Sequence, residues 1–170
     1  MLCRSEVQVA INANGILVRC GQSTICSRLV EGRFPDYSKL IDTEGSETAT
    51  LEVDSFHTAV RQADIVTSED SRGVDFSFDK GQLTLKTVAA DVGESTIEIP
   101  VTYDGGAVSI SFDPRYIIEF LRVLRPESTV SLHLIDSESA AVFRTDDGYT
   151  YVIMPLDRKS TRLNSSHALI

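Results

Sequence analysis

The sequence predicts an α+β fold that consists mainly of antiparallel sheet, with two short helices on one face. Most of the chain alternates apolar and polar residues with a period of two, which is typical of half-buried strands. Two stretches follow helical spacing instead. The same order of elements then occurs twice along the chain, so we predict a duplicated βαβββ unit.

Alternating apolar residues mark the strands in order along the chain. They are clearest at Val7/Val9/Ile11, Ile16/Val18/Cys20, Val74/Phe76/Phe78, Leu83/Leu85, Ile97/Ile99/Val101/Tyr103, Val108/Ile110/Phe112 and Val130/Leu132/Leu134. Turn sequences separate them at Asn14-Gly15, Asp79-Lys80-Gly81, Asp104-Gly105-Gly106 and Asp146-Asp147-Gly148. Each turn offers a residue that tolerates the positive φ of a tight hairpin, so we expect most neighbouring strands to pair with one another.

Two stretches are predicted to be short amphipathic helices. The first begins with Asp54 as its N-cap and ends near residue 65. Its apolar residues at helical spacing are Val53, Phe56, Val60 and Ala63. The second has Asp113 as its N-cap and Pro114 in the first helical position, and it ends before Pro126. Its apolar stripe consists of Ile117, Phe120, Leu121 and Leu124.

These elements divide the chain into three parts. Strand, helix and three strands cover about residues 48–103, and the same order covers about residues 107–156. Residues 6–29 supply three further strands, which match the end of such a unit. Residues 157–170 show neither alternation nor a helical stripe and resemble translated vector sequence. We therefore expect domains at residues 1–41 and 42–156 followed by a non-native tail, with a native basic tail that touches DNA as the alternative.

Composition excludes several classes of protein. The formal net charge is −9, and because residues 157–170 carry +2, residues 1–156 carry −11. Such an acidic chain does not coat nucleic acid indiscriminately, so any DNA contact must be local. No signal peptide or membrane-length apolar run occurs, and we expect a soluble cytoplasmic protein without a membrane partner. Cys3, Cys20 and Cys26 lack paired metal-ligand spacing and are expected to be reduced thiols.

Residues for catalysis are hard to find. A hydrolase site would pair His57 with Ser55 and a carboxylate such as Asp54 or Asp64, but no Gly-x-Ser-x-Gly turn surrounds them. We therefore expect no catalytic residue and no cofactor, and we keep a hydrolase on a β-rich scaffold as the alternative. A third hypothesis, a cell-surface β module, is disfavoured by the free cysteines and the absence of an export signal.

Metal binding is also not expected. Asp136, Glu138, Asp146 and Asp147 are acidic, but they lie at predicted strand ends and turns without calcium-loop spacing. Solvated carboxylates are the simpler interpretation of these four residues.

Two segments carry a family resemblance. Residues 28–37 read Arg-Leu-Val-Glu-Gly-Arg-Phe-Pro-Asp-Tyr, in which Gly32 permits a bend, Pro35 fixes φ, and Phe34 and Tyr37 are apolar anchors. Residues 151–156 read Tyr-Val-Ile-Met-Pro-Leu. Together they resemble the interdomain connector and last strand of the bacterial sliding clamps, the β subunits of DNA polymerase III. The resemblance runs from about residue 6 to residue 156 and covers less than half of a full clamp.

The resemblance implies a DNA clamp fold and a non-catalytic role in replication. Residues 1–41 would be the C-terminal part of the middle domain plus the connector, and residues 42–156 the C-terminal domain. A full clamp is a homodimeric ring that encircles duplex DNA without reading its sequence. It tethers the DNA polymerase III α subunit, the clamp loader and other proteins that carry a clamp-binding motif.

The resemblance also implies three functional surfaces. The partner-peptide cleft would contain Pro35, Lys39, Leu40, Asp113, Tyr116, Val152, Ile153, Met154, Pro155 and Leu156. The DNA channel would be lined by His57, Arg61, Arg115, Arg122 and Arg125. The ring interface would use Ile65 and Val66. Core packing is the alternative for Val152 and Ile153 and for the ring-interface pair, and a solvated helix face is the alternative for the arginines.

Overall fold

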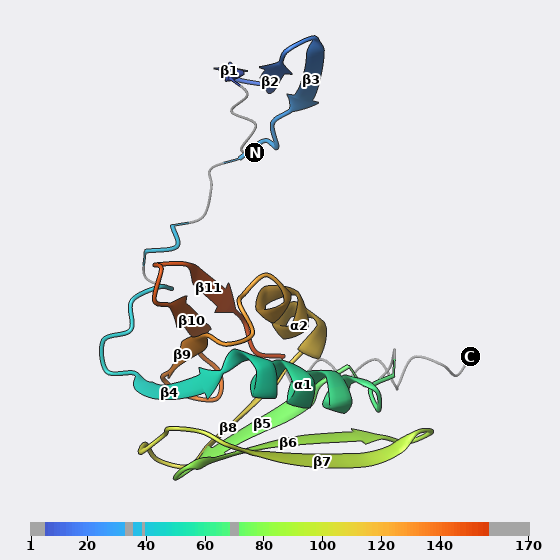
Figure 1. Cartoon of the computed structure of the whole chain (residues 1–170), viewed down its shortest axis with the longest axis vertical. Helices are drawn as coiled ribbons and strands as arrows, with labels where there is room; N and C mark the ends of the chain where they lie inside the picture. Colours follow the sequence, from blue (N-terminus) through green and yellow to red (C-terminus); the bar gives the residue numbers. More distant parts are fainter. Residues whose placement is uncertain (1–5, 33–35, 39, 69–71, 157–170) are drawn as a thin grey trace, which may run out of the picture. The chain divides into compact units, whose positions relative to one another are not determined.

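The computed structural model in Figure 1 describes residues 6–32, 36–38, 40–68 and 72–156. Predictions for Pro35, Lys39 and residues 157–170 therefore lie outside the described residues. The chain divides into two compact units, Met1–Asp36 and Tyr37–Ile170, and each is described by itself. The predicted domain division after residue 41 remains a prediction.

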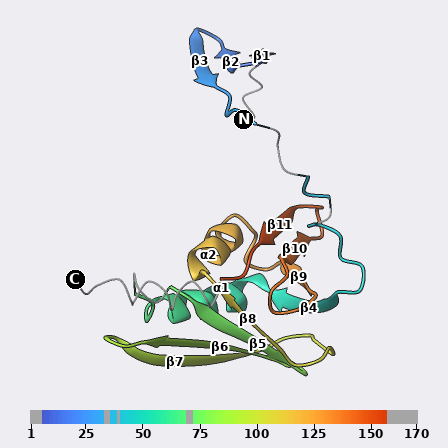
Figure 2. The ribbon, with the colours of Figure 1, turned by 180° about the vertical axis from the view of Figure 1, so that it is seen from behind.

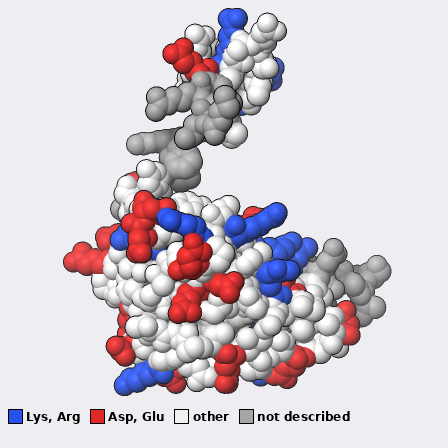
Figure 3. Space-filling model, in the orientation of Figure 1, with Lys and Arg blue, Asp and Glu red and all other residues white. Residues whose placement is uncertain are grey.

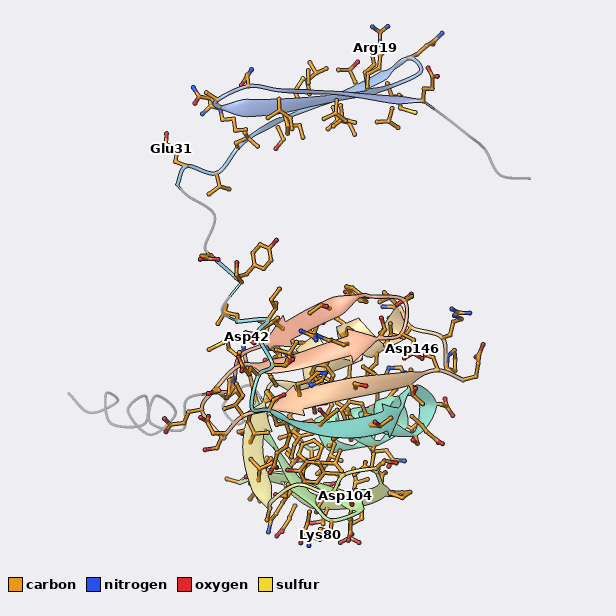
Figure 4. The ribbon with its side chains drawn as sticks, turned by 90° about the vertical axis from the view of Figure 1, so that its left-hand side faces the viewer. Arg19, Glu31, Asp42, Lys80, Asp104 and Asp146 are labelled. Carbon is orange, nitrogen blue, oxygen red and sulfur yellow. The ribbon has the colours of Figure 1, made fainter. Side chains whose placement is uncertain are left out.

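The first unit is a three-stranded antiparallel sheet in the order β1-β2-β3, as predicted for residues 6–29. Its strands are β1 (Val7–Ile11), β2 (Gly15–Cys20) and β3 (Ser23–Arg28). Val9 pairs with Val18, which pairs with Ile25, so apolar side chains line up on one face. Val9 is 55% and Ile25 69% exposed. Arg19 belongs to the opposite face, from which its side chain projects in Figure 4.

The second unit contains the predicted repeat of strand, helix and three strands. The first half comprises β4 (Glu47–Glu52), α1 (Val53–Asp64), β5 (Val74–Asp79), β6 (Gln82–Ala89) and β7 (Gly93–Pro100). The second half comprises β8 (Val108–Phe112), α2 (Pro114–Arg122), β9 (Thr129–Leu134), β10 (Ala141–Thr145) and β11 (Thr150–Ile153). All pairings are antiparallel, which confirms the predicted α+β class.

The two halves exchange their first strands. One sheet has the order β11-β10-β9-β4 and the other β7-β6-β5-β8, so β4 pairs with the second half and β8 with the first. Figures 1 and 2 show both sheets and place α1 beside β5–β8 and α2 beside β11. The helices also pack against one another. Neither half can therefore complete a sheet from its own strands.

Aromatic side chains fill the core where the two halves meet. Phe56 on α1 lies 6.3 Å from Phe76 on β5 and 6.4 Å from Phe143 on β10, measured between ring centroids. Phe120 on α2 lies 5.2 Å from Phe143. These four rings are buried, and ring pairs at such distances add to the free energy of apolar burial. The core thus links both helices to both sheets.

The start of α1 differs from the prediction. The N-cap is Glu52 and not Asp54, and the Glu52 side chain makes no capping hydrogen bond. Instead, the backbone N–H groups of Val53 and Asp54 donate to the carbonyl oxygens of Ser128 and Pro126, at 3.0 and 3.2 Å. A distant segment thus satisfies two donors that a local cap would otherwise serve. Asp54 lies in the first turn, where its negative charge interacts favourably with the positive end of the helix dipole.

The start of α2 is as predicted, with Asp113 as the N-cap and Pro114 in the first turn. Asp113 Oδ1 accepts hydrogen bonds from the Arg115 backbone N–H at 3.1 Å and from its Nε at 3.0 Å. Asp113 Oδ2 accepts one from Arg115 Nη2 at 2.5 Å. The hydrogen bond from the Arg115 side chain is the main reason that the pKa of Asp113 is lowered, and it raises the pKa of Arg115. A planar guanidinium thus holds a buried carboxylate in its charged form.

Two of the four predicted turns have the expected geometry. Gly81 and Gly148 have φ of 74° and 85°. Gly15 has no positive φ, and Asn12 closes that turn by accepting the Asn14 N–H at 3.0 Å. The prediction of a hairpin at Asp104-Gly105-Gly106 is wrong, because β7 pairs with β6 and β8 pairs with β5. This segment instead connects the two halves.

A buried tyrosine holds this connection in place. The Tyr103 hydroxyl donates to the Glu47 carboxylate and to the Gly106 carbonyl oxygen, the latter at 2.7 Å. The Gly106 N–H also donates to Glu47, at 3.0 Å. A Cβ at Gly105 would overlap both the Glu47 carboxylate and the ring of the buried Tyr103, which are held together by their hydrogen bond, so a larger residue would disturb this contact. Burial, followed by the hydrogen bond to Glu47, raises the pKa of Tyr103. Figure 4 shows the neighbouring Asp104 and Lys80 at this end of the unit.

Replacing Tyr103 with Phe should lower the free energy of unfolding by about 1–2 kcal/mol, because two acceptors lose a shared donor. Urea unfolding at neutral pH would measure the change. Tyr149→Phe, at a half-exposed tyrosine, is the matched control and should stay within about 0.5 kcal/mol of the parent. Equal effects of the two substitutions would contradict the role given to the Tyr103 hydroxyl.

Replacing Asp113 with Asn should remove a pH-dependent part of the stability. The folded state lowers the pKa of Asp113, so its stabilisation is complete above the unfolded pKa of about 3.9 and is lost as pH falls through the folded pKa. The difference in unfolding free energy between parent and variant should therefore shrink between neutral pH and about pH 3. Asp146→Asn serves as an exposed control. A difference that stays constant with pH would refute the prediction.

Candidate functional site

Three segments distant in sequence meet at the start of α2. The Leu156 backbone N–H, beyond β11, donates to the Ser111 carbonyl oxygen on β8 at 2.8 Å. A Cβ at Gly73, which precedes β5, would lie 3.0 Å from Ser111 Oγ and 3.4 Å from Leu156 Cδ1. Gly73 therefore allows this close approach. Neither Gly73 nor Ser111 was predicted as a site residue, because no sequence motif marks either residue.

This meeting point exposes apolar side chains. Tyr116, Met154 and Leu156 are 53%, 58% and 37% exposed. The Tyr151 hydroxyl donates to the Tyr116 carbonyl oxygen at 3.2 Å and so ties α2 to β11. We call the exposed residues Tyr116, Met154 and Leu156, which lie above the buried Ser111, the α2 corner. Exposed apolar residues on a backbone that hydrogen bonds hold in place are suited to bind an apolar side chain of a partner.

Other predicted cleft residues have different environments. Ile153 is only 5% exposed and belongs to the core, whereas Val152 and Pro155 are half-buried. Asp113 is buried and engaged with Arg115. These side chains can shape the α2 corner, but Ile153 and Asp113 offer little surface to a ligand.

The described part of the connector lies against the sheet that contains β10. The Leu40 N–H donates to the Tyr37 carbonyl oxygen at 2.9 Å, and the Leu40 side chain is 43% exposed. Arg144 Nη2 on β10 donates to the Ile41 carbonyl oxygen at 2.7 Å. The structure thus fixes where the connector enters the second unit.

Four of the five predicted DNA-channel residues lie on the two helices, His57 and Arg61 on α1 and Arg115 and Arg122 on α2. Arg125 lies three residues beyond α2, because the helix ends at Arg122 and not just before Pro126 as predicted. Arg61, Arg122 and Arg125 are exposed, and His57 is half-buried. Figure 3 shows basic side chains gathered around the region of α2, with acidic side chains spread over the rest of that face. Asp54 and Glu119 are also exposed on these helices. Any basic surface here is therefore small and interrupted by carboxylates.

Arg115 differs from the other three arginines. Its guanidinium is bound side-on by Asp113, and its side chain remains 53% exposed while that of Asp113 is only 7% exposed. Asp113 and Arg115 were predicted to belong to two different sites, and their ion pair was not predicted. The Asp-Pro-Arg order at a helix start is the signal that could have suggested it.

The predicted ring-interface residues follow α1. Ile65, the C-cap of the helix, is 77% exposed, and Val66 is half-buried. The Val66 N–H donates to the Ala63 carbonyl oxygen at 3.3 Å, so the chain ends α1 with a tighter turn of the 3₁₀ type. Burial within the unit, the alternative for this pair, does not apply to Ile65.

The geometry gives the hydrolase hypothesis no support. The Ser55 hydroxyl donates to the Glu52 carbonyl oxygen at 3.2 Å, which is a bond within its own helix end. His133 Nδ1 lies 3.1 Å from Thr48 Oγ1 across two strands, and burial lowers its pKa. Among the described residues, neither His57 nor His133 forms hydrogen bonds with both a hydroxyl group and a carboxylate.

Asp136, one of the predicted solvated carboxylates, accepts backbone hydrogen bonds within a turn. Asp136 Oδ1 accepts the Glu138 N–H at 2.8 Å and the Ser139 N–H at 2.6 Å, and these bonds lower its pKa. Within the described ranges, no three His, Cys, Asp or Glu side chains are grouped so that they could hold a metal ion. The helices described here are all too short or too polar to cross a membrane.

Comparison with known proteins gives consistent matches. The family model for the DNA polymerase III beta subunit, C-terminal domain, matches residues 38–157. The beta sliding clamp of Chlamydia muridarum is 31% identical over 148 residues, which cover 87% of this chain and 40% of that protein. The beta sliding clamp of Pseudomonas putida is 30% identical over 152 residues, covering 88% of this chain and 41% of that protein.

Solved structures of sliding clamps also resemble this chain. A sliding clamp from Pseudomonas aeruginosa, crystallised with a ligand, superimposes with a TM-score of 0.80 at 28% identity, covering 90% of this chain and 42% of that one. A clamp from Bartonella birtlesii bound to griselimycin gives a TM-score of 0.81 at 25% identity, covering 89% and 41%. The chain thus spans about two fifths of the length of these relatives. Its fold, its repeated unit and the family match over residues 38–157 together show that the chain belongs to the DNA polymerase III beta subunit family.

Proposed function

We propose that this chain is part of a bacterial sliding clamp, the non-catalytic processivity factor of DNA polymerase III. The observation that carries the proposal is the exposed apolar α2 corner on a domain of this family. The parent protein would form a homodimeric ring around duplex DNA in the cytoplasm. Such a role requires no cofactor, because the ring acts by holding its partners on the DNA.

The proposed mechanism is tethering. A polymerase bound to a ring that encircles DNA remains at high effective concentration near the primer end, so dissociation is replaced by sliding. The DNA polymerase III α subunit, the clamp loader and other proteins with a clamp-binding motif would bind through short peptides. Ring closure would use Ile65 and Val66, and the exposure of Ile65 supports that assignment.

We propose the α2 corner as part of the partner-peptide cleft. Tyr116, Met154 and Leu156 would contact the peptide directly, since they combine exposure with apolar surface. Ile153 and Asp113 would support them from beneath, and Val152 and Pro155 would form the edge. Pro35, Lys39 and Leu40 would complete the cleft from the connector. A flexible methionine suits a site that accepts several related anchors.

We propose that DNA is contacted weakly and without sequence preference by His57, Arg61, Arg122 and Arg125. Phosphate contacts of this kind hold a ring near the duplex without fixing its position. The exposed carboxylates on the same helices favour weak binding. Arg115 is a weaker candidate because Asp113 already occupies one side of its guanidinium.

Met154→Ala should weaken binding of a polymerase-derived clamp-binding peptide by about 1–3 kcal/mol if Met154 is a central anchor. Titration calorimetry with a longer form of the protein that contains the whole middle domain would measure the affinity. Val92→Ala, which truncates an equally exposed apolar residue at the β6–β7 turn, is the control and should leave the affinity unchanged. The same affinity for all three proteins would remove Met154 from the site.

The 170-residue chain should bind short duplex DNA weakly and lose that binding as salt rises, because its net charge is −9 and the basic surface proposed to contact DNA is limited to a few residues on and just after the helices. Fluorescence anisotropy at several salt concentrations would test this. Arg122→Gln and Arg125→Gln together should reduce the binding further. Tight, salt-resistant binding to one sequence would contradict the sliding-clamp proposal.

A further inference from the structure

Arg115 lies at the α2 corner in a fixed orientation. Its Nε and Nη2 donate to the two oxygens of Asp113, at 3.0 and 2.5 Å, so the planar group is held along one edge. Asp113 is itself fixed, because it is buried and also accepts the backbone N–H of Arg115 at 3.1 Å. The guanidinium is therefore preorganised in a way that an ordinary surface arginine is not.

The opposite edge of the guanidinium remains able to donate. An arginine has five N–H donors, and side-on binding by one carboxylate uses those of Nε and one of Nη2. The side chain of Arg115 is 53% exposed, whereas the carboxylate that holds it is 7% exposed. The Nη1 edge of a side-on pair points away from its carboxylate, which leaves it accessible to a second acceptor.

An exposed apolar side chain follows Arg115 directly in the chain. This residue, Tyr116, is 53% exposed and lies close enough to influence the pKa of Arg115. The exposed Leu156 is brought toward the start of α2 by the hydrogen bond from its N–H to the Ser111 carbonyl oxygen, and the exposed Met154 lies two residues before it. A ligand that fits here combines an apolar side chain with an acceptor for a planar, charged donor, and a peptide carboxylate is the group that matches a guanidinium best.

We propose that Arg115 makes the α2 corner selective for partner peptides that carry a carboxylate beside their apolar anchor. The inference rests on the proposed peptide cleft and adds a specificity to it. Arg115 acts here as a contact residue for the peptide, and Asp113 is the positioning residue that orients it.

The surrounding charges set the size of the effect. Arg115 and Arg72 both lower the pKa of Asp113, and Asp113 and Asp64 both raise the pKa of Arg115. The region therefore contains two positive and two negative side chains, with no net charge. The proposed preference for an acidic peptide therefore comes from the fixed N–H donors of Arg115 and not from a net positive charge. For a pair at a partly exposed site, we expect a preference of about two- to fivefold for the acidic peptide.

Nuclear magnetic resonance titration of the 170-residue chain would test the proposal with synthetic peptides. Each nine-residue peptide has a central Leu-Phe pair, with one Glu walked through the flanking positions, and has a matched peptide with Gln in place of Glu. At one or more positions the Glu peptide should bind about two- to fivefold more tightly, and this ratio should fall as salt rises.

The test variant is Asp113→Asn combined with Arg115→Gln, which leaves no unpaired buried charge and keeps a residue that can cap α2. The Glu-to-Gln affinity ratio should fall to about one in this variant. The matched control is Lys86→Gln combined with Glu94→Gln, which removes an exposed ion pair of 2.7 Å on the other sheet and should keep the parent ratio.

A ratio that survives in the test variant, or is absent in the parent chain, would overturn the inference while leaving the cleft intact. Failure of both peptides to shift resonances of the α2 corner, in this chain and in the longer form that contains the whole middle domain, would overturn the proposed cleft and the inference together. An unchanged peptide ratio accompanied by weaker binding of duplex DNA would assign Arg115 to DNA and also overturn it.

Discussion

The exchange of first strands between the two halves is the constraint on which the second unit depends. Because β4 pairs with β9 and β8 pairs with β5, each four-stranded sheet needs strands from both halves. The aromatic core is built across the same division, with Phe56 of the first half against Phe143 of the second. Folding of either half alone would leave an incomplete sheet and an open core, so the repeat is stable only as a pair.

Polar contacts then hold the places where the chain passes between the halves. Tyr103 fixes the segment that leads into β8, and the carbonyl groups of residues 126 and 128 receive the first N–H groups of α1. These contacts lie at the ends of helices and strands, where apolar packing alone does not fix the path of the chain. They set the position of α1 and of the segment before α2, and thereby the position of the surface that we propose to bind peptides.

The same architecture separates two kinds of proposed contact. The α2 corner offers fixed apolar groups and one preorganised guanidinium, which suits binding that distinguishes one peptide from another. The exposed helix faces carry a few arginines mixed with carboxylates, which suits weak contact with any duplex. A clamp needs both properties, since a partner must be held while the DNA must be free to move.

Sequence alone determined much of this protein. Period-two alternation predicted the strands, helical spacing predicted both helices, and Asp113-Pro114 located the start of α2, because these signals arise from local geometry and one-sided burial. Local signals failed at Asp54 and at Gly105-Gly106, where groups distant in the chain decided the outcome: Pro126 and Ser128 in one case and Glu47 in the other.

Tertiary structure alone decided which strands exchange, which predicted cleft residues are exposed, and that Arg115 pairs with Asp113. Alternation shows that a strand has an apolar face but does not identify its partner, since every such face is compatible with several neighbours. Likewise, Ile153 and Met154 are adjacent apolar residues in sequence, and only the packing of β11 places one in the core and the other at the surface.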